Sequence, residues 1–382
     1  MNKYKRSRIL QSSITVFILI LWVILLVFSF DTLVIAVIRY ELLQIEIFLV
    51  VLVILAHIAA TVIHELGHLV FGSISGYQFS SFRIFSITLM KEDEKIKLKR
   101  VKMPGTAGQC LMAPPEINNG KMPTVLYNIG GCLLGIIVVI ISVIGMMFTR
   151  YYPIPYFIFA ANLIMNLHTV LSNGIPMHTR FIPNDGMNVI SLRNDRTAME
   201  AFRLQLLISV ENHRGLILSE MPDEWFSMPH DQELGNNFTA ARAYLCCLRL
   251  IEKCEYDEAE AAIEHLFYTG ANLTGNYRAI LLSELLFIYS YKGETEKAEA
   301  IFRGELKRYL RAFKRFFSVC RSVYAYALLV RGDDAVAYKI DKRFERTKIS
   351  RLGAADRKIF ELEKEKMKEV RRIYESLNTK DG

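Results

Sequence analysis

The chain has 382 residues, of which 52% are hydrophobic, and its mean hydropathy of +0.23 is too high for an ordinary soluble protein of this size. Apolar residues are concentrated in the first half and charged residues in the second, so we expect a membrane domain at 1–190 followed by a soluble domain at 191–382. The net charge of +8 calls for no nucleic-acid partner, because basic residues beside apolar stretches meet the anionic surface of a lipid bilayer.

Four apolar stretches are long enough to cross a bilayer, which takes about 20 helical residues. They cover residues 9–30, 47–72, 125–149 and 156–173. The first stretch is too long for the apolar part of a signal peptide and lacks a small-residue cleavage site, so we expect an uncleaved span. Residues 31–46 fit either an interfacial turn or an early start of the second span.

Basic residues set the expected topology of these spans. Lysines and arginines at 3–8 precede the first span and are expected to stay in the cytoplasm. Four crossings then place the lysine-rich loop 78–122 and the C-terminal half on that same side. We expect an integral, multi-pass protein with cytoplasmic N- and C-termini, and the short loops favour a prokaryotic plasma membrane.

The loop after the second span has the pattern of a β-hairpin. Residues 79–89 alternate loosely between apolar and polar, 91–94 are typical of a turn, and 95–99 alternate strictly. One face of this hairpin is apolar and is available to the membrane surface or to a partner strand.

From about Arg193 onward the apolar pattern is helical. Three similar segments carry alanines at Ala259, Ala298 and Ala335, each expected at a packing point between helices. This spacing predicts a degenerate array of tetratricopeptide-like helical hairpins, and a generic helical bundle is the alternative. The highly charged residues 354–377 predict a solvated terminal helix.

The expected fold class is therefore an all-α polytopic membrane protein with a small β-hairpin insertion and a C-terminal α-helical, tetratricopeptide-like cytosolic domain. The concave surface of such an array typically recruits a protein or peptide. We expect it to bind the substrate or a cytosolic regulator.

A His-Glu-Leu-Gly-His segment lies inside the second apolar stretch. Its two imidazoles, His64 and His68, are four residues apart and so lie on one helical face, where the Glu65 carboxylate also reaches. Ionisable side chains at that depth are costly and need a functional explanation. The spacing predicts a divalent metal ion with a general base beside it.

A catalytic zinc ion usually takes three protein ligands, and Asp185 is the best third candidate. It follows the fourth span, which Pro176 ends or kinks. We expect Gly186 to let the backbone turn so that the preceding carboxylate points back to the metal. Taken alone, these residues also fit a simple Asp-Gly turn at a membrane exit.

Together these motifs resemble the site-2 protease family of intramembrane zinc metalloproteases, which combine HExxH in one transmembrane helix with Asn-x-x-Pro…Asp-Gly at a later one. The matching residues are His64, Glu65 and His68 for the first motif, and Asn173, Pro176, Asp185 and Gly186 for the second. The resemblance covers roughly residues 45–190, and residues 128–131 echo a glycine-rich signature of the family's third span. The chain departs from many members in that eight residues, 177–184, separate the proline from the aspartate.

The resemblance implies a zinc metalloendopeptidase with Zn²⁺ bound by His64, His68 and Asp185. Glu65 is expected to take a proton from the attacking water and to deliver it to the leaving amine. By family analogy the Asn173 amide stabilises the oxyanion or holds the peptide backbone. The substrate class is a membrane-embedded protein or peptide: a regulatory protein, a signal-peptide remnant or a peptide precursor.

Two other functions compete with this one. A catalytically silent membrane adaptor would dock partners through the helical tail, but it would have no need of the intact Glu65. A metal transporter or sensor would need further ligands along the membrane, where the sequence offers only His57 and His168.

Asn162, Asn166, Thr169 and Asn173 form one stripe along the fourth span. Our hypothesis is that the stripe lines a water route to the metal. Hydrogen bonding between helices is the alternative.

Overall fold

The computed structural model describes residues 3–40, 42–92, 95–100, 107–118, 121–178, 183–304, 306–313, 316–349 and 352–379. The chain forms two compact units, Met1–Met199 and Glu200–Gly382.

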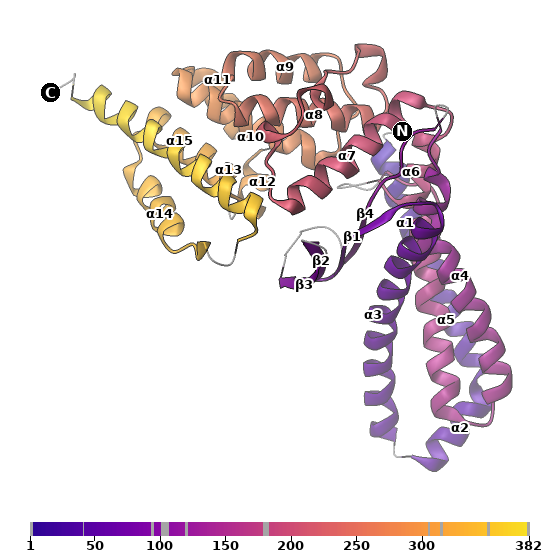
Figure 1. Cartoon of the computed structure of the whole chain (residues 1–382). Coiled ribbons are helices and arrows are strands. Elements are labelled where there is room, and N and C mark those ends of the chain that lie inside the picture. Colours follow the sequence, from indigo (N-terminus) through magenta and orange to yellow (C-terminus); the bar gives the residue numbers. More distant parts are fainter. Residues whose placement is uncertain are drawn as a thin grey trace. The chain divides into compact units, whose positions relative to one another are not determined.

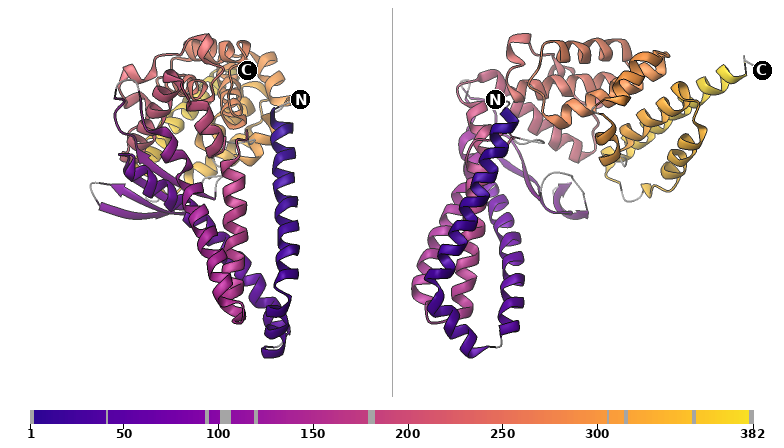
Figure 2. Two further views of the ribbon diagram at one scale, coloured as in Figure 1. Left: turned by 90° about the vertical axis from the view of Figure 1, so that its right-hand side faces the viewer. Right: turned by 180° about the vertical axis from the view of Figure 1, so that it is seen from behind.

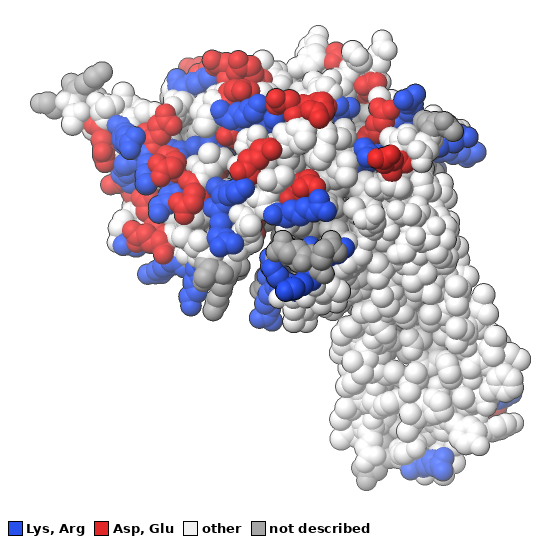
Figure 3. Space-filling model, in the orientation of Figure 1, with Lys and Arg blue, Asp and Glu red and all other residues white. Residues whose placement is uncertain are grey.

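In the described part of the first unit, four helices are long and apolar enough to cross a membrane. They are α1 (Lys3–Phe28), α3 (Leu42–Ile74), α4 (Thr124–Thr149) and α5 (Pro153–Gly174) (Figure 1). All four predicted stretches are thus helical, and the second begins at Leu42 rather than near Ile47. The face of this bundle seen in Figure 3 is almost free of charged side chains over most of its length, which fits a membrane protein.

The core of the bundle is the group α3, α4 and α5, which run side by side (Figure 2). Glycines let α3 and α4 approach closely, because a Cβ on Gly67 would lie 2.3 Å from the Gly130 carbonyl oxygen. The first helix, α1, packs mainly on α5, where Ile14 and Ile18 bury themselves against Ile164.

The segment between the first two spans contains a short helix instead of a turn, and the second span starts early, as one of the two expectations had it. Its first residues form the short helix α2 (Phe30–Arg39), and its last residues already belong to α3. The start of α2 is tied to the end of α4, since Thr32 Oγ1 donates to the Arg150 carbonyl at 2.9 Å and Asp31 pairs with the Arg150 guanidinium at 3.0 Å.

The predicted hairpin is part of a larger antiparallel sheet, which has four strands in the order β3-β2-β1-β4 within the described residues. The strands are β1 (Gln78–Ile84), β2 (Ile87–Glu92), β3 (Lys95–Arg100) and β4 (Gly108–Ala113). The hairpin β2–β3 is confirmed, although turn residues 93–94 lie outside the described residues.

The loop differs from the expectation in one strand that is divided and in one strand that was not predicted. Residues 79–89 form two strands rather than one, because the chain turns at Phe85, whose φ is +51°. The strand β4 was not predicted, since Cys110, Leu111 and Met112 are consecutively buried and leave no alternating pattern to detect.

The second unit is helical and is joined to the first through α7. Its helices are α7 (Arg196–Arg214), α8 (Asn237–Glu252), α9 (Tyr256–Tyr268), α10 (Gly275–Lys292), α11 (Thr295–Arg303), α12 (Leu306–Ala312), α13 (Phe317–Ala325), α14 (Asp334–Glu345) and α15 (Ala354–Asn378). Short 3₁₀ turns cover Leu218–Glu220, Asp223–Phe226 and Asp231–Glu233, and a π-helical turn covers Tyr326–Val330. Helical hairpins such as α8–α9 and α10–α11 are present, and the tetratricopeptide-like classification stays a prediction.

Two details of this unit differ from the sequence-based expectation. Ala259 and Ala298 are fully buried as predicted, but Ala335 is exposed and Ala337 takes the buried position in α14. The terminal helix α15 is not simply solvated, because Phe360 and Val370 on one of its faces are buried in the core.

A buried group of charges holds α15 in place. The fully buried Arg321 of α13 pairs with Glu284 of α10, and its Nε lies 3.0 Å from a Glu363 carboxylate oxygen of α15. Lys366, one turn after Glu363, donates to the Ile251 carbonyl at 2.8 Å. Opposite charges thus balance inside the core and link three helices.

Removing one partner of such a group should be costly, because it leaves buried charge uncompensated. We expect Arg321→Met to lower the free energy of unfolding of this unit by about 3–5 kcal/mol. The measurement is urea unfolding of the detergent-solubilised chain, followed by Trp225 fluorescence in a Trp22→Phe background. The exposed Lys368→Ala should show no measurable change, and a similar result for Arg321→Met would contradict the assignment.

Candidate metal centre

Three side chains that sequence reasoning selected come together at one point. The Nε2 atoms of His64 and His68 are 3.2 Å apart, and an Asp185 carboxylate oxygen lies 3.0 Å from the first and 3.4 Å from the second. Among the described residues this is the one group of histidine, cysteine and acidic side chains arranged to hold a metal ion. The long separation of Asp185 from Pro176 in sequence therefore does not keep its carboxylate away from the two imidazoles.

A hydrogen bond determines the expected protonation of His68. Its Nδ1 lies 2.8 Å from the Tyr127 carbonyl oxygen at the start of α4. A carbonyl only accepts, so Nδ1 must carry the proton, and in the neutral ring Nε2 presents a lone pair to the centre. Tyr127 is itself held in place by its hydroxyl, which donates to the Cys110 carbonyl of β4 at 3.0 Å.

The imidazole of His64 lies directly against the backbone of α4. A Cβ placed on Gly131 would be 2.4 Å from His64 Nδ1 and would overlap the ring. The adjacent Gly130 meets Gly67 of α3 in the same way. The glycine-rich residues of the third span therefore make room for the HELGH segment, which is the physical reason for that part of the pattern.

The carboxylate of Asp185 arrives from the first residue of α6 (Asp185–Leu192). Its Oδ2 is buried and, within the described residues, faces no donor other than the two imidazoles. Burial opposes its charge, but the positive charge that His68 and His64 carry when protonated outweighs that effect and holds the pKa of Asp185 below its usual range. A bound cation would favour the ionised carboxylate in the same sense.

We expected Gly186 to be needed for a turn of the backbone, and this reason was wrong. This glycine is not among the described residues with a positive φ. Instead, a Cβ on Gly186 would lie 2.2 Å from the Gly174 carbonyl oxygen. Glycine at this position permits the first turn of α6 to pack onto the end of α5.

The group of His64, His68 and Asp185 is called the ligand triangle below, and Glu65 lies beside it and faces the sheet. A Cβ on Gly108, the first residue of β4, would lie 2.5 Å from Glu65 Oε1. The Glu65 carboxylate also accepts a hydrogen bond from the backbone of Cys110. Burial and this neighbouring carboxylate raise the pKa of the Cys110 thiol to about 12, so it stays protonated at neutral pH.

Sequence reasoning missed the residues that build the walls of this centre. Arg83 of β1 is buried and donates to the carbonyls of Phe85 at 2.8 Å and Gly108 at 3.3 Å, which holds β4 at its place beside Glu65. The signal for Arg83 was present, because it is a lone charge between apolar residues. Tyr127 acts through its backbone carbonyl, which no residue pattern reveals.

The polar side chains of the stripe on α5 form hydrogen bonds within their own helix. Asn173 Nδ2 donates to the Thr169 carbonyl at 3.0 Å, and Asn162, Asn166 and Thr169 likewise donate to carbonyls of their own helix. These hydrogen bonds do not join α5 to another helix. The water route and the oxyanion role of Asn173 stay predictions. The other two histidines that the sequence offered near the spans, His57 and His168, lie near each other.

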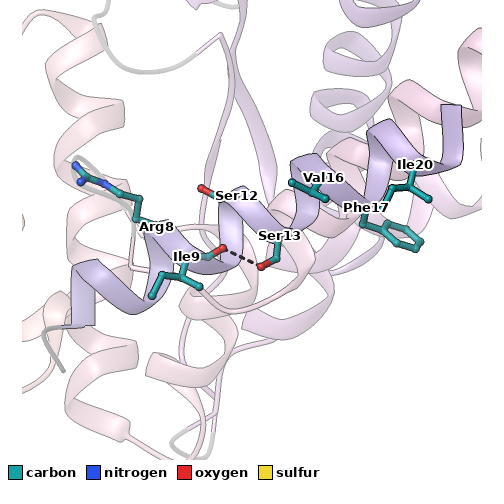
Figure 4. Close-up of a pocket in the computed structure, with 7 residues that line it drawn as sticks. All are labelled: Arg8, Ile9, Ser12, Ser13, Val16, Phe17 and Ile20. Atoms are coloured by element: carbon teal, nitrogen blue, oxygen red, sulfur yellow. Dashed lines mark hydrogen bonds between the residues drawn. The ribbon is translucent and has the colours of Figure 1, made fainter. Parts of the chain in front are cut away.

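An open groove of about 530 Å³ lies along α1 (Figure 4), and none of its lining residues belongs to the candidate metal centre. The residues that line it are Arg8, Ile9, Ser12, Ser13, Val16, Phe17 and Ile20. Because all of them belong to one helix, this is an open groove on its surface. We assign the chemistry to the ligand triangle, where ionisable groups converge.

No protein-family model matches the chain, and neither a curated protein nor a solved structure is significantly similar to it. The geometry of the site therefore carries the functional conclusion.

Removal of any member of the triangle should abolish tight metal binding. We expect Asp185→Ala and His64→Ala each to weaken Zn²⁺ affinity by more than about 100-fold, since even an outer partner of a ligand contributes about 10–100-fold. Affinity is measured by competition with a chromophoric chelator on the purified chain. Equal affinity in wild type and both variants would show that the triangle does not hold the ion.

The packing of His64 on α4 gives a second test with a matched control. We expect Gly131→Ala to displace the His64 ring and to weaken Zn²⁺ binding, because the added methyl group overlaps the imidazole. At Gly135, one turn along α4, a Cβ would meet only a Val170 methyl group at 2.7 Å. Gly135→Ala should keep its zinc, and equal binding by the two variants would contradict this role of Gly131.

Proposed function

We propose that the chain is an intramembrane zinc metalloprotease of the site-2 protease type. The observation that carries the proposal is the convergence of His64, His68 and Asp185 next to Glu65. Four apolar helices support the membrane part of the proposal. Two imidazoles and a carboxylate are a common catalytic set for zinc, with the fourth position left open.

The spacing of the three donor atoms fits zinc. A tetrahedral ion whose ligands lie at about 2.0–2.1 Å separates any two ligand atoms by about 3.3 Å. The three separations between donors are 3.0, 3.2 and 3.4 Å. The buried Oδ2 of Asp185, with no further donor among the described residues, also fits a cation at this point.

The catalytic work of the protein falls to Glu65. His64, His68 and Asp185 would hold a zinc ion, which would supply Lewis-acid polarisation of the scissile carbonyl and would lower the pKa of water. Glu65 takes the proton from the attacking water and delivers it to the leaving amine. The backbone of Cys110 orients the carboxylate, and Gly108 closes the site on that side.

The substrate is a membrane-embedded protein or peptide. A helical substrate must unwind locally, because helix hydrogen bonds shield its backbone from attack. The sheet is the proposed partner for the unwound segment, through addition of a strand. The backbone of Cys110 contacts Glu65 and Tyr127, so the outer edge of β4 is already occupied. The other edge of the sheet is the exposed strand β3, where a substrate strand would add.

The remaining expectations belong to the same proposal. The N- and C-termini are cytoplasmic, the membrane is a prokaryotic plasma membrane, and the second unit binds the substrate or a regulator. The basic residues of β3 and of the N-terminus support this orientation.

The decisive test uses Glu65→Gln, which removes the base and keeps the size of the side chain. We expect this variant to retain zinc and to lose about 10²–10⁴-fold in turnover, the usual contribution of a general base. Quantitative membrane proteomics of cells that carry either form should reveal a precursor that only the wild type cuts.

The same comparison distinguishes the alternatives. A silent adaptor or a metal transporter predicts identical membrane proteomes for wild type and Glu65→Gln. Identical proteomes, with both proteins expressed and loaded with zinc, would sink the protease proposal.

A further inference from the structure

The side chain of Asn184 joins the end of α5 to the start of α6. Its Nδ2 donates to the carbonyls of Ser172 at 2.8 Å and Ile175 at 2.6 Å. Its Oδ1 accepts from the backbone N–H groups of Met177 at 2.9 Å and Met187 at 3.1 Å. Asn184 is buried, and these four bonds use its full capacity of two donors and two acceptor sites.

Each of the four partners is a backbone group near a helix end. The carbonyls of Ser172 and Ile175 are at the end of α5, and the Met187 N–H is in the first turn of α6. Helix ends leave such groups without partners inside the helix. One side chain therefore fixes how the end of α5 and the start of α6 lie relative to each other.

The contact continues beyond the two helices. The Asn184 backbone N–H donates to the Met177 carbonyl at 3.3 Å, so the two residues are bonded in both directions. Met177 is buried in a cluster with Ile14 and Ile18 of α1. Residues 179–182 lie outside the described residues, and the Met177–Asn184 link spans that segment directly.

We propose that Asn184 is a positioning residue that holds the Asp185 carboxylate at the metal centre. Asp185 is the next residue and begins α6, so the bonds of Asn184 determine where this third donor lies. The inference rests on the proposed metal site and assigns Asn184 no contact with the ion. It explains how Asp185 reaches His64 and His68 although eight residues separate it from Pro176.

An ordinary helix cap makes a different prediction. Loss of an N-cap side chain lowers stability by about 1 kcal/mol and leaves a correctly placed ligand unchanged. A positioning role instead changes the affinity and the coordination geometry of the metal. The two roles are therefore separated by a spectroscopic measurement on the metal.

The experiment uses the full-length chain in detergent with Co²⁺ as the probe, because the visible absorption of Co²⁺ reports its coordination geometry. We expect Asn184→Ala to bind Co²⁺ about 10–100-fold more weakly than wild type and to change the visible bands. Asn188→Ala, the same substitution one turn further along α6, is the control and should match wild type. Thermal unfolding of each variant accompanies the titrations.

A second variant keeps the test decisive if Asn184→Ala does not fold. Asn184→Asp retains the two acceptor contacts but loses both donors and places negative charge beside two carbonyls. We expect it to weaken Co²⁺ binding and to alter the bands as well. Wild-type affinity and spectrum in a folded variant of either kind would overturn the positioning role.

The outcome for Asp185 separates this inference from the proposed function. If Asp185→Ala weakens Co²⁺ binding and Asn184→Ala does not, the metal site stands and the role of Asn184 is wrong. If wild type and Asp185→Ala bind Co²⁺ equally, the proposed metal site itself is wrong.

Discussion

The arrangement of the candidate metal centre depends on the close approach of two apolar helices. Where α3 meets α4, Gly67 and Gly130 bring the backbones together more closely than any residue with a Cβ would allow. This approach brings the Tyr127 carbonyl to His68 and the face of Gly131 to His64. Two imidazoles thus obtain fixed orientations in an apolar surrounding, where freely rotating polar rings would be costly.

Sequence reasoning found the parts of the centre that are encoded at short range. His64 and His68 lie on one face of their helix because a helix has 3.6 residues per turn, and the apolar flanks of that helix indicate a membrane setting. Asp185 was selected by motif, and the structure brings it to the pair. The contributions of β4 and Arg83 could not be predicted, because they arise from contacts between segments that are distant in sequence.

Burial of charge was the hardest property to predict in the second unit. Residues 354–377 carry many charges, which is typical of a solvated helix, yet Glu363 and Lys366 are buried. They belong to a group that includes Arg321 of another helix, and this partner cannot be deduced from the composition of residues 354–377. The shift from Ala335 to Ala337 has a similar origin, since the register of α14 is set by packing.

The order of the donors along the chain has a consequence for biosynthesis. Two donors belong to the second long helix, whereas the third follows the last of the four. A ribosome must therefore release Asp185 before any complete site exists. A partly inserted nascent chain therefore lacks the complete donor group, and any chemistry that needs all three donors would begin only after the bundle has closed.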